Sequence, residues 1–165
     1  MKTVLLLCIF SCLFVVFSCS QKNTSLPPPV TKRTVKPGDT IAYAIIEYKK
    51  EYRPYLKNMV TSATLSKQET SEIEKLTSTA VARYNTAQKR RNMQINNILS
   101  YYRQYIPAIN ANGEKEVFVN CFCDAMGSDW QTSIVIVRDG GSCFFQFKIN
   151  LKTKRIRDFY VNGEA

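Results

Sequence analysis

The sequence predicts an α+β domain in which one helix, or two, packs against a four- to five-stranded antiparallel meander sheet. Two patterns support this fold class. The capping box Ser66-Lys67-Gln68-Glu69 opens a stretch in which apolar residues recur at helical spacing. From Tyr101 onward, apolar and polar residues alternate instead, and turn residues separate the alternating runs. A helix followed by antiparallel strands is typical of domains in which the helix covers one sheet face.

The chain begins with a short apolar segment that ends just before Cys19. Lys2 supplies one positive charge, residues 4–16 are apolar, and the small residue Ser18 precedes the cysteine. This is the layout of a secretory signal peptide. As a helix the apolar run would be about 20 Å long, whereas a bilayer core is about 30 Å thick, so a permanent transmembrane helix is disfavoured.

The segment Val16-Phe17-Ser18-Cys19 resembles the lipobox of bacterial lipoprotein precursors, in which an aliphatic, a variable and a small residue precede a cysteine. Phe17 is bulkier than is usual at its position in that family. The resemblance implies cleavage of residues 1–18, lipidation of the Cys19 thiol and acylation of the new amino group. Two or more acyl chains would anchor the protein stably in a membrane. The alternative is an ordinary secretory signal followed by an incidental cysteine.

The residues that follow Cys19 predict a location in the envelope. In lipoproteins of enteric bacteria an Asp at the next position marks retention in the inner membrane; here that residue is Ser20, which implies the outer membrane. Lipoproteins exported to the surface of Bacteroides-type bacteria often carry acidic residues there, and Gln21-Lys22-Asn23 has none. We therefore expect a periplasm-facing domain, and an envelope location argues against nucleic acid as a partner.

Composition separates a tether from a domain. Residues 19–40 are polar and contain Pro27-Pro28-Pro29, which predicts a disordered tether ahead of a single domain at residues 41–165. The net charge of +10 favours anionic surfaces, although a solvated basic surface without a dedicated partner is the alternative. The chain has no histidine, which excludes Ser-His-Asp and Cys-His nucleophile systems and every histidine-containing metal site.

Within the predicted domain, residues 41–60 have apolar residues at helical spacing, with Asp39 as a possible N-cap and Pro54 as a kink or break. Tyrosines at this spacing suit either packing against a sheet or a sugar-stacking surface. The helix after the capping box should end near Asn85. Its apolar face comprises Ile73, Leu76, Ala80, Val81 and Tyr84. Lys89-Arg90-Arg91 then opens a basic connection, which could contact phosphate groups or be solvated.

Alternation predicts five strands after the helix. They span residues 101–109, 116–123, 130–137, 143–151 and 156–161. Pro107 suggests that the first strand lies at an edge, and Asp139-Gly140-Gly141 is a strong hairpin signal between the third and fourth. The element order is similar to that of cystatin-like folds, an analogy that implies no function. Stretches such as Val119-Asn120-Cys121-Phe122-Cys123 resemble small uncharacterised lipoproteins of Bacteroides-type bacteria, which bring no assigned activity.

Three cysteines form the cluster that is most able to bind a metal or to undergo redox chemistry. Cys121 and Cys123 alternate with Val117 and Val119 on one strand face, and Cys143 opens a later strand. The CxC spacing lacks an evident fourth metal ligand, so we expect neither a metal nor another cofactor. If a strand separated them, Cys143 would lie about 10 Å from Cys121. Buried core thiols are the first interpretation, and one disulfide or a soft-metal or redox site are the others.

These observations favour a lipid-anchored, non-enzymatic binding or structural module of the cell envelope. The ligand surface is expected on the exposed sheet face, at Phe144, Gln146, Lys148 and Tyr160. Its partners would be the membrane, through the lipid, and an anionic envelope polymer or another envelope protein. Two alternatives are a periplasmic protein inhibitor and an envelope hydrolase that uses loop carboxylates. Those carboxylates would come from Asp124, Asp129 and Asp139. Two carboxylates in a deep pocket would favour the hydrolase, and a shallow apolar groove would favour the binder.

Overall fold

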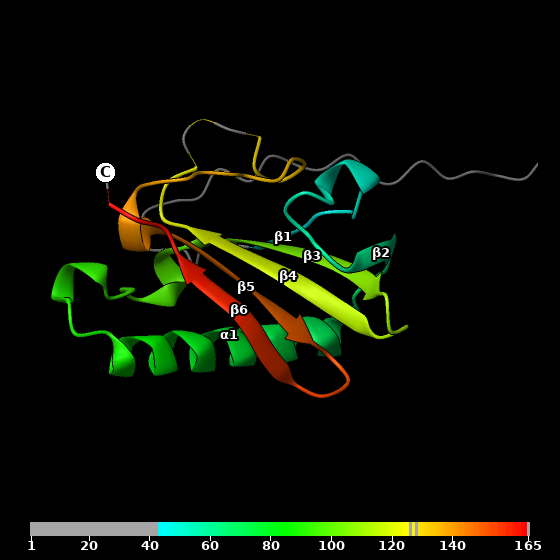
Figure 1. Cartoon of the computed structure of the whole chain (residues 1–165), viewed down its shortest axis with the longest axis horizontal. Helices are drawn as coiled ribbons and strands as arrows, with labels where there is room; N and C mark the ends of the chain where they lie inside the picture. The colour runs from blue at the N-terminus through cyan, green and yellow to red at the C-terminus, as the bar shows by residue number, and fades with distance from the viewer. Residues whose placement is uncertain (1–42, 126, 128, 165) are drawn as a thin grey trace, which may run out of the picture. The chain divides into compact units, whose positions relative to one another are not determined.

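One long helix lies across a mixed sheet of six strands in the computed structural model of the chain, which describes residues 43–125, 127 and 129–164. Figure 1 shows α1 (Lys67–Ala87) on one side of the strands and irregular segments on the other. The predicted α+β class is confirmed, and the sheet is mostly antiparallel. Predictions for residues 1–40, which include the signal peptide, Cys19, the tether and Asp39, lie outside the described residues.

Helix α1 begins at the predicted capping box. The Ser66 hydroxyl accepts the N–H of Glu69 at 3.1 Å, and the Glu69 carboxylate accepts the N–H of Ser66 at 2.8 Å. These two bonds satisfy backbone donors that the first helical turn leaves free. The helix continues to Ala87, two residues beyond the predicted end.

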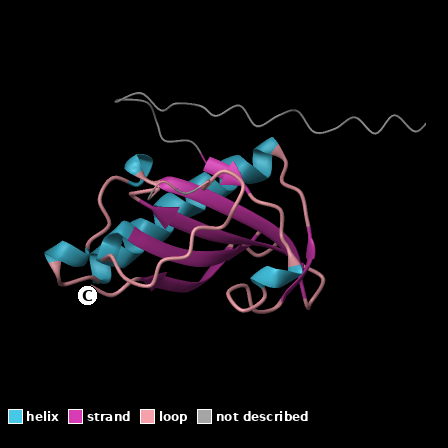
Figure 2. Ribbon diagram, turned by 90° about the horizontal axis from the view of Figure 1, so that it is seen from above, coloured by secondary structure: helices cyan, strands magenta, loops and turns pink. Residues whose placement is uncertain are grey.

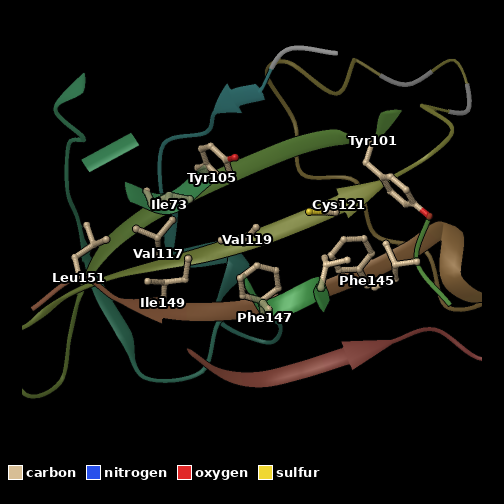
Figure 3. Close-up of a cluster of buried hydrophobic side chains, with 13 residues drawn as sticks. Ile73, Tyr101, Tyr105, Val117, Val119, Cys121, Phe145, Phe147, Ile149 and Leu151 are labelled. Carbon is tan, nitrogen blue, oxygen red and sulfur yellow. The ribbon is translucent and has the colours of Figure 1, made fainter. Parts of the chain in front are cut away.

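The apolar face of α1 meets one face of the sheet in a hydrophobic core. Figure 3 shows Ile73 of α1 facing side chains from three neighbouring strands. The strand residues of this core include Tyr105, Val117, Val119, Cys121, Phe145, Phe147 and Ile149. Each of these seven is fully buried. The alternation of residues 117–121 and 145–149 is confirmed, because these residues share one core with α1 whereas Phe118 belongs to a separate cluster on the other face. Burial of side chains this large supplies the main free energy that holds α1 to the sheet.

A polar group crosses the same interface. One carboxylate oxygen of Glu74 accepts the Nε–H of Arg103 at 3.2 Å and the hydroxyl of Tyr105 at 2.6 Å. Arg103 is only 3% exposed, so the carboxylate compensates a charge that would be costly to bury alone. Burial, and then the neighbouring Glu74 charge, raises the pKa of Tyr105 far above its ordinary value. The phenol therefore stays protonated and donates to the carboxylate.

The four C-terminal strands form the predicted antiparallel meander. They are β3 (Tyr102–Asn110), β4 (Lys115–Phe122), β5 (Phe144–Asn150) and β6 (Arg155–Val161). Asn110-Ala111-Asn112-Gly113 joins β3 to β4, as predicted, and Gly113 adopts a φ of 75° that favours glycine. The prediction of a strand at residues 130–137 is wrong. Those residues form a loop, so β4 pairs directly with β5.

Residues 43–62 are not the kinked helix that their spacing suggested. They form β1 (Tyr43–Ile45), a 3-10 turn η1 (Lys50–Tyr52) and β2 (Met59–Ser62). Ala44, Ile46 and Tyr48 are buried while their neighbours are exposed, which is the period of a strand. β1 runs parallel to β3, and β2 runs antiparallel to it. These two short strands raise the strand number above the predicted four or five.

Pro107 does not place β3 at an edge of the sheet, because β4 pairs with β3 on one side and β1 and β2 on the other. β1 is aligned with β3 up to Tyr105, and β2 is aligned with it from Ala108. Pro107 thus lies where one partner replaces the other, and its carbonyl accepts the N–H of Ala63 at 3.2 Å. A residue without an N–H is tolerated at such a junction.

The second face of the sheet is also largely covered. Tyr48, Leu56 and Met59 from the β1–β2 connection pack with Ile106 and Phe118 from the sheet. Trp130 and Ile134 of the loop between β4 and β5 pack against the same cluster. Figure 2 shows these irregular segments passing over the strands on the side opposite α1. The exposed sheet face that the sequence predicted is therefore confined to the part that these segments leave open.

Candidate functional site

The opening on the second face is a groove of about 390 Å³, which we call the Tyr55–Tyr160 groove. It is lined by Tyr55, Phe118, Ile136, Val137, Arg138, Gln146, Tyr160 and Asn162. These residues come from the β1–β2 connection, three adjacent strands, the β4–β5 loop and the segment after β6. Its volume lies within the range of small-ligand sites, about 300–1,000 Å³.

The floor of the groove is set by the register of the sheet. Gln146 of β5 lies opposite Asn120 of β4 and Tyr160 of β6, so the Gln146 amide and the Tyr160 ring are neighbours on one face. Phe118 lies two residues before Asn120 on the same face and is 5% exposed, which leaves its ring as an apolar part of the floor. The floor therefore combines an aromatic surface with one amide.

The wall formed by residues 136–138 is held by a side-chain amide. The Asn162 Nδ2 group donates to the carbonyl oxygens of Val137 at 2.8 Å and Asp139 at 2.9 Å. Asn162 is 1% exposed, so replacement of these bonds by water is disfavoured. Gly140 follows with a φ of 87°, and a Cβ there would lie 2.7 Å from the Phe144 ring. The Asp139-Gly140-Gly141 turn thus shapes the end of a loop instead of the predicted hairpin.

A disulfide closes the same loop at its two ends. Cys123 and Cys143 are bonded, their Cα atoms are 5.0 Å apart, and the Cys123 N–H donates to the Cys143 carbonyl at 2.9 Å. The first interpretation of Cys123 as a buried core thiol is wrong. That interpretation placed a strand between Cys123 and Cys143, and without this strand the two residues continue the β4–β5 pairing. Cys121 does face the core, and burial raises the pKa of its thiol far above the ordinary value.

The rim of the groove exposes aromatic surface and a positive charge. Tyr55 is 51% exposed and Tyr160 is 54% exposed, while Ile136 is 38% exposed. Arg138 is exposed and has no ion-pair partner among the described residues. A ligand in the groove can therefore meet flat apolar surfaces, an amide and a guanidinium group.

The structure brings together two of the four ligand residues predicted from the sequence. Gln146 and Tyr160 line the groove. Lys148 is 6% exposed, and its ammonium group binds the Asp158 carboxylate at 3.0 Å, so it supports the sheet beside the groove. Phe144 is half-buried beneath Gly140 and does not line the groove. Cys19, the predicted lipidation site, lies outside the described residues.

Several groove residues were missed by sequence reasoning. Tyr55 lies in the segment predicted as a kinked helix, Ile136 lies in the strand predicted at residues 130–137, and Arg138 directly follows that predicted strand. Asn162 follows the last predicted strand, and the sequence alone indicated no role for it. A usable signal was Pro54, because a proline inside an apolar helical pattern favours a break or a turn at that point.

A second hollow of about 460 Å³ lies at the turn ends of the strands and is more polar. It is lined by Asn110, Asn112, Glu114, Asn150, Thr153, Arg155 and Arg157. Hydrogen bonds from Asn150 and then Lys152 lower the pKa of Glu114. Neither described hollow contains a pair of carboxylates, and Asp124, Asp129 and Asp139 line neither of them.

Three wider observations bound the interpretation of the site. In the described part of the chain, no helix combines the length and the apolar character needed to cross a membrane. Among those same residues, no group of three or more Cys, Asp or Glu side chains is arranged to hold a metal ion. Comparison of the chain with known protein families, curated proteins and solved structures finds no match. Function must therefore be argued from the geometry of the groove and from the N-terminal sequence.

Proposed function

We propose that this protein is a lipid-anchored, non-enzymatic binding protein of the bacterial envelope that binds an acidic glycan in the Tyr55–Tyr160 groove. The observation that carries the proposal is the combination of two half-exposed tyrosines with Arg138, which has no ion-pair partner among the described residues. The N-terminal lipobox supports the anchor, and Ser20 after Cys19 supports an outer-membrane, periplasm-facing location.

The chemistry of the groove suits an acidic sugar. A pyranose ring has an apolar C–H face that packs on an aromatic ring and hydroxyl groups that bond to amides such as Gln146. A guanidinium group binds a carboxylate or a phosphate through two parallel hydrogen bonds. Tyr55 and Tyr160 supply the rings, and Arg138 supplies the charge at the same groove. The basic net charge of the chain would also attract a polyanion.

The same geometry favours binding over hydrolysis. Glycoside hydrolysis ordinarily requires two carboxyl groups about 5–9.5 Å apart on either side of the scissile bond. Among the described residues, no Asp or Glu lines the groove. Glu114 is the one acidic residue among those that line the second hollow. A periplasmic inhibitor would use a projecting loop or a free strand edge, such as that of β6, whereas the exposed rings and Arg138 gather in a concave groove.

The anchor is tested with Cys19→Ala. Metabolic labelling with a palmitate analogue, followed by detergent partitioning, should show lipid on the wild-type chain and none on the variant, because the lipidated thiol is missing. Equal labelling of both chains would refute the lipoprotein assignment.

The groove is tested by isothermal titration of the full chain with a galacturonic acid hexamer and a neutral glucose hexamer. Tyr160→Ala should weaken binding of the acidic hexamer about fivefold, since a stacked ring contributes about 1 kcal/mol. Arg138→Gln should weaken the acidic hexamer about tenfold or more and leave the neutral hexamer unchanged. Arg155→Gln is the matched control, because Arg155 is exposed and has no ion-pair partner among the described residues. Binding that both groove variants leave intact would refute the site.

A further inference from the structure

The part of the chain between Glu74 and Glu114 contains no acidic residue and six basic ones. Four of these six lie at the C-terminal end of α1 and in the turn that leads into η2 (Arg91–Met93). They are Arg83, Lys89, Arg90 and Arg91, which we call the basic cluster. All four are exposed, and none has an ion-pair partner in the described part of the chain.

The basic cluster is carried by ordered backbone. The Tyr84 hydroxyl donates to the carbonyl of Met93 at 3.1 Å, and the Asn85 amide donates to the carbonyl of Ile95 at 2.7 Å. The Asn85 side-chain oxygen also accepts the N–H of Ile95 at 2.8 Å. These bonds fold residues 88–95 back onto the last turn of α1, at the left of Figure 1. The charges are therefore presented together at one end of the helix.

Acidic side chains do little to neutralise this end of the domain. Each of the seven ion pairs among the described residues engages a basic side chain outside the basic cluster. An acid that does lie here is Glu164, whose two carboxylate oxygens accept the Asn92 amide at 2.9 and 3.1 Å. The four cations of the basic cluster therefore outnumber the Glu164 carboxylate.

We infer that the basic cluster contacts the anionic phospholipid headgroups of the membrane that holds the lipid anchor. The inference rests on the proposed anchor for its choice of partner. The chain has residues 20–42 between Cys19 and the first described strand, a length that can span at most about 80 Å when extended. As a flexible coil, the same length would average about 25 Å, so the membrane surface is within reach of the domain.

A bilayer surface fits this arrangement better than a free phosphate ion. A single phosphate is usually held by donors that converge in a concave backbone nest or a helix N-terminus. The basic cluster instead surrounds the C-terminal end of α1, and its side chains are exposed to solvent. Near an anionic membrane, each Lys or Arg strengthens binding about fivefold, so Lys89, Arg90 and Arg91 together contribute on the order of 100-fold.

The test uses the full chain, purified from membranes and placed in nanodiscs of phosphatidylcholine alone or with phosphatidylglycerol. Hydrogen exchange of the amides in residues 88–95 should slow several-fold on the anionic discs and not on the neutral discs. The slowing should disappear at molar salt, because screening shortens the range of the attraction to about 3 Å. It should also disappear in the triple variant Lys89→Glu, Arg90→Glu, Arg91→Glu.

The matched control is the triple variant Lys50→Glu, Arg53→Glu, Lys67→Glu, which changes the net charge equally at exposed residues without ion-pair partners among those described. Hydrogen exchange in this control should still slow on the anionic discs. If the control variant loses the slowing, the assignment to the basic cluster is refuted. Equal exchange on the two kinds of disc would refute the membrane contact. The same slowing by millimolar inorganic phosphate without discs would identify a phosphate site and refute the bilayer surface.

This experiment tests the lipid anchor and the membrane contact of the basic cluster separately. Intact mass shows whether Cys19 carries lipid, whereas hydrogen exchange reports only on residues 88–95. A chain found without lipid is added to the same discs, and the comparison between anionic and neutral discs is repeated. Slowing without lipid would refute the anchor alone, and lipid without slowing would refute the membrane contact alone.

Discussion

Removal of Arg157 should destabilise the protein strongly, because it leaves the Glu116 carboxylate buried without a charged partner. Glu116 of β4 has no exposed surface. The Arg157 Nε–H donates to one of its carboxylate oxygens at 2.7 Å, and the Nη2 group donates to the other at 2.6 Å. The pKa of Arg157 is raised by these bonds from Glu116. The geometry is that of a bidentate pair, the strongest form of an arginine–carboxylate interaction.

The expected cost follows from the asymmetric burial of the two side chains. Breaking a buried ion pair by removal of one partner typically costs about 3–5 kcal/mol. The Arg157 side chain is 36% exposed and lines the polar second hollow, so water can reach the vacated space. We therefore expect Arg157→Met to lower the free energy of unfolding by about 3 kcal/mol, the lower end of that range. Glu116→Gln should cost less, about 1–2 kcal/mol, because the partly exposed guanidinium group can be solvated.

Urea unfolding of the two single variants and the double variant provides the measurement. The double variant should cost about 2 kcal/mol less than the sum of the single variants, since each single change leaves one unpaired partner. Lys154→Met is the control, because the Lys154–Glu72 pair is 3.8 Å apart with side chains 51% and 35% exposed. It should cost less than about 1 kcal/mol. An Arg157→Met cost as small as the control's would refute the reasoning.

Three further predictions concern stability. Replacing both Cys123 and Cys143 by Ala should lower the free energy of unfolding in urea by about 3 kcal/mol, because the disulfide joins residues 20 positions apart. A variant as stable as the oxidised wild type would contradict this. Cys121→Ser should cost about 1–3 kcal/mol more than Cys121→Ala, because an unpaired hydroxyl is buried; equal urea midpoints would show an exposed thiol. The hydrogen bond from Lys115 lowers the pKa of Glu69 below 4.5, so this pair stabilises the fold above pH 4.5 and loses its effect as pH falls through the lowered value. The free-energy difference between wild type and Glu69→Gln should therefore shrink below pH 4.5, and a constant difference down to pH 2 would contradict it.

Much of the fold could be predicted because local patterns and tertiary contacts agree there. The Ser66 capping box and the apolar stripe of α1 specify the same helix, and the alternation at Val117–Cys121 specifies which face of β4 meets it. Asn110–Gly113 forms the hairpin turn that its composition indicates. In each case the short-range signal and the tertiary contacts favour the same conformation.

Prediction failed where two periods fit the same residues. Ile45, Tyr48 and Tyr52 fit a helical spacing of three to four, whereas Ala44, Ile46 and Tyr48 fit the alternation of a strand. The pairing of β1 with β3 decides between them, and its partner residues lie about sixty positions further along the chain. A single sequence does not contain the information that these two segments meet.

The candidate site was half predictable for a related reason. Gln146 lies on a regular strand, so its position on the second face follows from alternation. Tyr160 lies after an irregularity in β6 that turns its side chain to the face opposite that of Ile156, which alternation alone would not predict. Tyr55 and Arg138 lie on irregular segments, and the position of such residues depends on what those segments pack against. Lys148 follows the same alternation as Gln146, but its burial depends on the pairing with Asp158, which lies within the irregularity in β6.

The loop over the second face explains why β-branched residues at 130–137 do not form a strand there. Its backbone is bonded by side chains of the sheet: Gln104 binds Trp130, Ser133 and Val135, and Asn120 also binds Val135. Asn162 does the same for the residues that form the groove wall. Because buried amides satisfy these backbone groups, the loop needs no strand partner. The wall of the Tyr55–Tyr160 groove is thereby ordered before any ligand arrives, and a ligand that binds there does not bear the entropic cost of ordering it.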